Sequence, residues 1–341
     1  MKKPNNPAIP TLTATIALLA FAGPAAGQST LFEDNFNTGN DSLTASSVPG
    51  GIAPNSYTSY EIVSSRPDNI YPAVGSGSLA LGLNGGTLSG FWEAQAVFSS
   101  TPITLESVDD YINLTYTFTD TASLLSGSTT SAIAAGLYDD GGSPPLDEGA
   151  LNNSGLTTSA FPSGGTAGWQ GYVGVLAPSG GNHAIYNRLP QSGSTSANQD
   201  LIGNGWTYGF AHPAGVAGTL IGGAAASTVS LAQGSQYTMS LQITLSAPGT
   251  LTVAEDLYSG ADASGALLAS LEDSYSGVTD TSFDGMAIGA RNVSSTVANP
   301  EMTVTGITVT DDIQPLTLPE PSAYVLGGVV ALLAIGCRRL H

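Results

Sequence analysis

Residues 237–258 read YTMSLQITLSAPGTLTVAEDLY and contain two alternating segments joined by a turn. Apolar and polar side chains alternate over residues 237–245 and again over residues 250–258, the period of a strand with one buried face. Between them, Pro248 fixes φ at about −65° and Gly249 accepts a positive φ, as a type II turn requires. The stretch therefore predicts a β-hairpin.

Similar alternation recurs through residues 28–313. INLTYTFTD, residues 112–120, places Leu114, Tyr116 and Phe118 on one face, and MTVTGITVTDD, residues 302–312, changes parity at Gly306, which predicts a bulge. Turn-forming residues separate the segments, and no helical period or repeat of fixed length interrupts them. The expected fold class is all-β, a two-sheet antiparallel β-sandwich over residues 28–313.

The charge of the chain excludes one class of partner. Its 341 residues include 7 Lys and Arg against 26 Asp and Glu, and only Arg66, Arg188 and Arg291 lie between the two ends. A body with this excess of negative charge repels nucleic acid and anionic lipid, so no nucleic acid partner is expected. A hydrophobic content of 41% is enough for a core, despite 43 glycines.

The first residues have the pattern of a secretory signal. Lys2 and Lys3 precede the apolar run Leu12–Ala22, and Ala25-Ala26-Gly27 supplies small residues for cleavage after Gly27. We expect residues 1–27 to be a signal peptide read by the secretion translocon. An uncleaved anchor or a buried helix is the alternative.

The last residues predict a single transmembrane helix over residues 323–337. Ala323–Cys337 carries no charge and, as a helix, covers roughly 22 Å of a ~30 Å hydrocarbon core. Arg338 and Arg339 favour a cytoplasmic end, so the acidic body is expected outside. A buried core helix is the alternative. Because Cys337 is the single cysteine, no intrachain disulfide is possible.

The tail as a whole resembles a known sorting signal. Pro319-Glu320-Pro321, the apolar segment and Arg338-Arg339 stand in the order of the PEP-CTERM signal of Gram-negative envelope proteins. The resemblance implies that residues 314–341 are a sorting tail recognised by an exosortase after a transient inner-membrane stage. It also implies delivery to the envelope, outer surface or extracellular matrix, where such proteins accompany exopolysaccharide production.

The body resembles concanavalin A-like and laminin-G-like jelly rolls in the succession of its strands. The segments that carry the resemblance are LFEDNFN from Leu31, LALGLNGG from Leu79 and FDGMAIGARN from Phe283. The resemblance implies a jelly-roll sandwich. A parallel β-helix and a pair of immunoglobulin-like sandwiches remain alternatives.

Catalytic residues are not predicted. A glycosidase needs two carboxylates about 5 to 9.5 Å apart, whereas Glu255-Asp256 and Glu272-Asp273 are adjacent pairs that point to opposite faces of a strand and are expected at solvated strand ends. His183 and His212 show neither zinc-ligand spacing nor a nucleophile elbow beside them. Both are expected on the surface or in turns.

Two groups of residues are candidates for ligand binding. The loop YDDGGSPPLDEGALNN, residues 138–153, offers Asp139, Asp140, Asp147 and Glu148 as oxygen ligands for a structural Ca²⁺, although a solvated acidic loop has the same composition. Trp169, Trp206 and Tyr208 are candidates for stacking on sugar rings, although large aromatics in a sandwich also form the core.

These observations favour an exported, non-catalytic structural or glycan-binding surface module with extracellular polysaccharide as a partner. The alternative is a secreted polysaccharide-active hydrolase whose carboxylates come from strands distant in sequence.

Overall fold

The computed structural model describes the strands of the body and some of their connections. The described residues are 27–36, 61–64, 73–75, 77–82, 89–121, 132–143, 165–177, 182–190, 201–202, 218–278, 280–294 and 301–313. Among them, the only helix is the 3₁₀ turn η3, Gly165–Gly168, and none is long and apolar enough to cross a membrane. Residues 1–26 and the predicted sorting tail, residues 314–341, lie outside the described ranges.

The described strands form two large antiparallel sheets and one small pair. Sheet A has the order β14-β13-β12-β7-β17-β4-β3, with β1 also paired to β17. Its strands are β1 Ser29–Asp34, β3 Ala73–Gly75, β4 Ser78–Leu81, β7 Tyr111–Asp120, β12 Gln236–Ala247, β13 Thr250–Ser259, β14 Leu267–Tyr275 and β17 Met302–Asp312.

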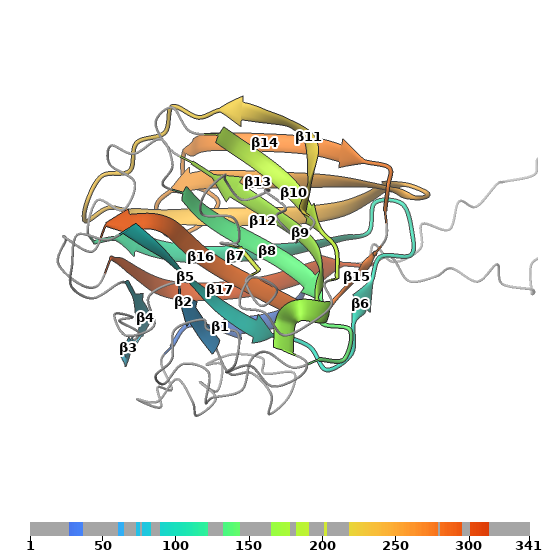
Figure 1. The fold of residues 1–341 in the computed structure, drawn as a ribbon, viewed down its shortest axis with the longest axis horizontal. Coiled ribbons are helices and arrows are strands. Elements are labelled where there is room, and N and C mark those ends of the chain that lie inside the picture. The colour runs from blue at the N-terminus through green and yellow to red at the C-terminus, as the bar shows by residue number, and fades with distance from the viewer. Residues whose placement is uncertain are drawn as a thin grey trace, which may run out of the picture.

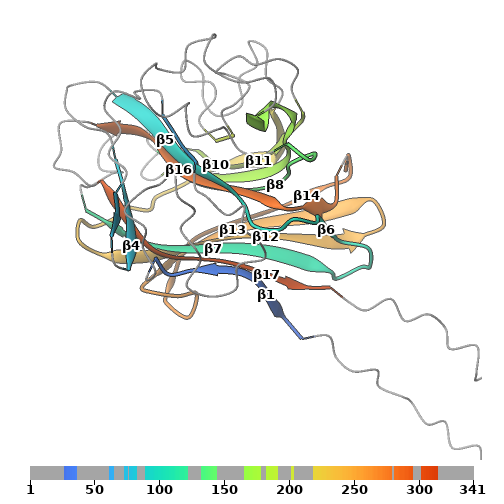
Figure 2. The ribbon, with the colours of Figure 1, turned by 90° about the horizontal axis from the view of Figure 1, so that it is seen from below.

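Sheet B has the order β11-β10-β9-β8-β16-β5-β2. Its strands are β2 Glu61–Ser64, β5 Ser89–Val97, β8 Ala132–Asp139, β9 Gln170–Leu176, β10 Asn182–Arg188, β11 Gly218–Ala226 and β16 Gly285–Ser294. The small pair joins β6 Ile103–Thr104 to β15 Ser282–Phe283. Figures 1 and 2 show sheets A and B stacked face to face, so the predicted two-sheet antiparallel sandwich is confirmed for the described residues.

The hairpin predicted from residues 237–258 is present as β12 and β13. The two strands pair antiparallel from Tyr237 opposite Ser259 to Ala247 opposite Thr250. Gly249 has a φ of 71°, the positive value that the Pro-Gly turn requires. The bulge predicted at Gly306 is also present, because the register of β17 against β7 shifts between Val304 and Gly306.

The inward side chains of both sheets form the main core. In β7, buried and partly exposed residues alternate along the whole strand, and the buried set includes the predicted Leu114, Tyr116 and Phe118. These pack with Leu137 and Ile288 of sheet B in one hydrophobic cluster.

A second apolar cluster covers the other face of sheet B. It includes Tyr138, Trp169, Val173, Leu201 and Ile202. Sheet B is therefore buried on both faces over most of its described strands, whereas the outward side chains of sheet A are mostly only partly buried.

Candidate functional site

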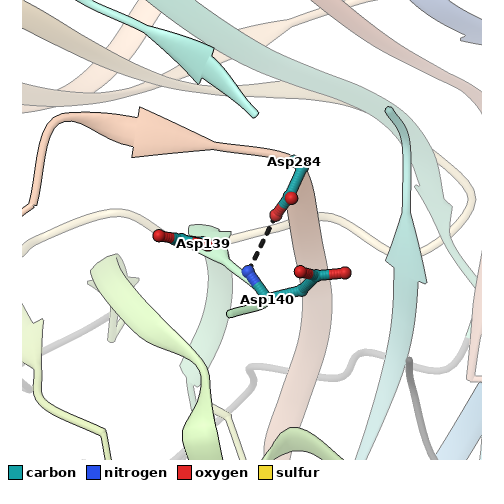
Figure 3. A group of neighbouring side chains, drawn as sticks. All are labelled: Asp139, Asp140 and Asp284. Atoms are coloured by element: carbon teal, nitrogen blue, oxygen red, sulfur yellow. Dashed lines mark hydrogen bonds between the residues drawn. The ribbon is translucent and has the colours of Figure 1, made fainter. Parts of the chain in front are cut away.

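Three aspartates from distant parts of the chain meet at one end of sheet B. Asp139 is the last residue of β8, Asp140 follows it, and Asp284 directly precedes β16. The strands β8 and β16 are paired with Tyr138 opposite Gly285, which brings their ends together. One carboxylate oxygen from each aspartate lies within 4.8 Å of the others, and Figure 3 shows Asp284 directed toward the backbone of Asp140.

Backbone N–H groups orient these carboxylates. The Asp140 N–H donates to Asp284 Oδ1 at 2.7 Å, the Gly141 N–H to Asp139 Oδ1 at 2.8 Å, and the Gly142 N–H to Asp140 Oδ1 at 2.5 Å. Gly141 and Gly142 have φ values of 61° and 76°, so the chain reverses here at residues without a side chain.

The charge of the three-aspartate cluster is poorly compensated. Asp284 is 3% exposed. The pKa of Asp284 is raised to about 7, mainly by burial and also by the carboxylates of Asp140 and Asp139. The hydrogen bond from the Asp140 N–H lowers this pKa but does not outweigh the other causes. Burial also raises the pKa of Asp140. In the described part of the chain, no Lys or Arg offsets these negative charges. A divalent cation or a shared proton would relieve the repulsion.

The spacing is compatible with Ca²⁺. Two oxygens that each lie about 2.3 to 2.6 Å from one Ca²⁺ are separated by at most about 5 Å, and the three aspartates meet that limit. The pKa of Asp280 is raised to about 6, mainly by burial and also by the negative charge of Asp139. Asp139, Asp140 and Asp284 are therefore the described residues that could hold a cation.

Two of the three aspartates in this cluster were predicted from the sequence. Asp139 and Asp140 were predicted as ligands, and the structure adds Asp284, which lies 144 residues from Asp140 in the chain. The other two predicted ligands, Asp147 and Glu148, lie outside the described residues. The pairing of β8 with β16 was the missing information, because no local spacing in the sequence reports it.

A histidine and a glutamate meet between the two sheets. His183 Nε2 of β10 lies 2.7 Å from Glu255 Oε2 of β13, and the two residues are 3% and 1% exposed. The expectation that His183 is a surface or turn residue is wrong, because it points inward from a strand of sheet B. The expectation that Glu255 lies at a solvated strand end is also wrong, because Glu255 is a buried residue within β13. Its side chain points to the opposite face of the strand from that of Asp256, as predicted.

The environment of Glu255 favours its neutral form. Burial raises its pKa to about 7 and Asp256 adds to the shift, while the hydrogen bond and charge of His183 oppose it. Gly174 of β9 makes room for the carboxylate, since a Cβ at that position would lie 2.6 Å from Glu255 Cδ. Glu255 Oε1 has no hydrogen-bond partner among the described residues.

Glu93 occupies the outer face of sheet B and has a structural role there. It lies in β5 and is fully buried. Its Oε1 accepts from the Leu201 N–H at 3.0 Å and its Oε2 from the Ile202 N–H at 2.8 Å. Both oxygens thus hold a passing segment of chain against the sheet.

Trp169 is part of the core, which corrects its prediction as a sugar-stacking residue. It is fully buried, its Nε1 donates to the Ser143 carbonyl at 2.8 Å, and its ring packs near Tyr138 with 6.1 Å between centroids. The ring is therefore unavailable to a ligand. Trp206, Tyr208 and His212 lie outside the described residues.

Comparisons with known proteins return similar structures but no family. No protein-family model and no curated protein match the chain. The alginate lyase from Aplysia kurodai is 13% identical, with 82% of this chain and 98% of that chain covered and a TM-score of 0.40. The endo-1,3-β-glucanase from Streptomyces sioyaensis is 12% identical, with 86% and 99% covered and a TM-score of 0.39.

Lectin II from Ulex europaeus is 12% identical, with 77% of this chain and 97% of that chain covered and a TM-score of 0.36. At such scores and identities, these similarities indicate neither a shared ligand nor a shared reaction.

Proposed function

We propose that this chain is an exported, non-catalytic β-sandwich of the jelly-roll type that serves as a structural or glycan-binding module of the bacterial envelope or extracellular matrix. The burial of four acid and base side chains carries the proposal. In the described part of the chain, Glu93, His183, Glu255 and Asp284 are each 3% exposed or less. A general acid or base must reach a polymer substrate, directly or through one water, and these groups face backbone or one another.

The three-aspartate cluster then has a stabilising role. A Ca²⁺ held by Asp139, Asp140 and Asp284 would join the end of β8 to the start of β16 and offset three neighbouring carboxylates. Such an ion would supply a fixed positive charge and no reactive group of its own. Burial of Asp284 at 3% exposure favours this role over direct contact with a large ligand.

The alternative function is a secreted polysaccharide hydrolase. One observation favours it: Asp284, with a pKa raised to about 7, lies beside Asp140, and an acid with a raised pKa beside a second carboxylate is the pairing that glycosidases use. A hydrolase with this site would release reducing ends from a polysaccharide, and Asp284→Asn would abolish that release. The proposed function predicts no release by the unaltered protein.

Export and sorting are supported by the two termini of the sequence. The lysines and the apolar run of residues 1–27, and the Pro319-Glu320-Pro321 motif with its apolar segment and paired arginines, predict translocon and exosortase as transient partners. Mass spectrometry of the mature protein from its native host tests this prediction. We expect a new N-terminus at Gln28 and loss or modification of the tail, and recovery of the uncleaved chain from cytosol would contradict it.

A glycan array tests the binding activity. The full-length protein should bind one or more neutral glycans and should not bind nucleic acid, because its body is strongly anionic. Absence of any glycan signal at high protein concentration would leave only the structural role.

A further inference from the structure

The outward face of sheet A carries an ordered array of hydroxyl and amide side chains. The strands β17, β7 and β12 lie side by side at the centre of the sheet. We name the central six residues of this array the hydroxyl face: Asn113 and Thr115 of β7, Ser240 and Gln242 of β12, and Thr308 and Thr310 of β17.

The strand register places these residues in two straight rows. Thr308 lies opposite Thr115, and Thr115 lies opposite Ser240. In the next row, Thr310 lies opposite Asn113, and Asn113 lies opposite Gln242. Since neighbouring strands are about 4.8 Å apart, each row presents hydrogen-bonding groups at regular spacing across three strands.

Hydrogen bonds within the face fix several of its side chains. Ser240 Oγ donates to Asn113 Oδ1 at 2.8 Å, and Asn113 Nδ2 donates to Thr115 Oγ1 at 3.2 Å. Gln242 Nε2 donates to Thr244 Oγ1 at 3.1 Å. All of these residues are partly exposed, so donors and acceptors remain in contact with solvent while the rotamers are already restricted. Such preorganisation lowers the entropy lost on binding.

The charges around the face select against an anionic partner. Glu33 of β1 lies opposite Thr308, and Asp256 of β13 lies opposite Ser240, so a carboxylate flanks the first row at each end. None of the described strands of sheet A contains a Lys or Arg. A neutral polymer rich in hydroxyl groups meets no repulsion here, and the carboxylates can accept from its hydroxyls.

We propose that the hydroxyl face binds a neutral polysaccharide chain laid across strands β17, β7 and β12. This inference rests on the proposed glycan-binding function and names both its surface and its class of ligand. The six residues of the hydroxyl face include no aromatic ring for a sugar to stack on, so each sugar unit contributes little. Affinity therefore comes from several units bound at once, and long chains bind better than short oligosaccharides.

The test compares two triple variants of the full-length chain. Thr115→Val, Ser240→Ala and Thr308→Val together remove the first row of hydroxyls and keep strand-forming side chains. The matched control makes the same kinds of change at exposed residues on or just after β11 of sheet B: Thr219→Val, Thr228→Val and Ser230→Ala. Equal melting temperatures for the three proteins would show that folding is intact.

Binding is measured by co-sedimentation with amorphous cellulose and with immobilised dextran, and alginate serves as the anionic comparison. The unaltered protein and the control should bind at least one neutral polymer and leave alginate unbound, and the hydroxyl-face variant should bind about tenfold more weakly. Equal binding by all three proteins would overturn this inference and keep the proposed function. No binding of any polymer would overturn this inference together with the glycan-binding role, and would leave only the structural role. Self-association through this face, seen by sedimentation and lost in the variant, would overturn the polysaccharide as its occupant.

Discussion

His183 Nε2 lies 2.7 Å from Glu255 Oε2 in the interior of the sandwich, and this contact joins β10 of sheet B to β13 of sheet A. An acid and a base this close are often read as catalytic machinery. Here both side chains are buried between the sheets, and the only described groups that shift the pKa of Glu255 by charge are His183 and Asp256. The pair therefore acts on stability and on the fit of the two sheets.

The free energy of unfolding should decrease as pH rises from about 4.5 to about 7. Glu255 has a folded-state pKa of about 7 against an ordinary value of 4.5, so the folded protein keeps a proton that the unfolded chain has released. The stabilisation is complete below the unfolded pKa and is lost as pH passes the folded pKa. Urea unfolding across this range should give a flatter profile for Glu255→Gln.

Glu272→Gln is the control for this experiment, because Glu272 lies on the neighbouring strand β14 and is exposed. Its profile should follow that of the unaltered protein. Identical profiles for both variants and the parent would show that Glu255 does not titrate in this range.

Gly174→Ala should destabilise the protein by about 1 to 3 kcal/mol, because the added methyl group would overlap the Glu255 carboxyl group. In a double-mutant cycle, the cost should be smaller in a Glu255→Ala background, which removes Cδ and Oε1 and leaves only the Cβ contact at 3.0 Å. Gly223→Ala is the matched control, since a Cβ there meets nothing within 4 Å. An equal cost for Gly174→Ala in both backgrounds would mean that the two residues do not compete for space.

Calcium should stabilise the protein through the three-aspartate cluster. At a Ca²⁺ concentration about 100-fold above its dissociation constant, the melting temperature should rise by about 5 °C relative to chelator. Asp284→Asn removes one of the three carboxylate charges and should reduce the rise, whereas Glu272→Gln should retain it in full. The same melting temperature with Ca²⁺ and with chelator would indicate that the carboxylates share a proton instead.

Trp169→Ala should lower the free energy of unfolding by about 3 to 5 kcal/mol, because it removes a fully buried ring from the second core cluster. Denaturant unfolding measures this loss. Glycan binding per folded molecule should stay unchanged. A selective loss of binding with stability intact would restore Trp169 as a ligand contact.

Local patterns predicted the strands well. The alternation of residues 112–120, the hairpin of residues 237–258 and the bulge at Gly306 all appear in the structure, because strand period and turn chemistry are encoded by neighbouring residues. The two-sheet class followed from them. The jelly-roll type and the sorting tail stay predictions.

Contacts between strands that are distant in the sequence could not be predicted from local patterns. The meeting of Asp140 with Asp284 depends on β8 pairing with β16, and the meeting of His183 with Glu255 depends on which strands of the two sheets face each other. The burial of Trp169 likewise depends on a segment that covers the outer face of sheet B. A single chain without related sequences does not report such contacts.

The proposed non-catalytic, glycan-binding role is tested most directly by measuring binding and cleavage in one sample. The full-length protein is incubated with the neutral polysaccharide that retains it, and bound protein and new reducing ends are both quantified. We expect retained protein and no reducing ends above the blank. Reducing ends that accumulate with time and disappear in Asp284→Asn would contradict it and identify the protein as a hydrolase.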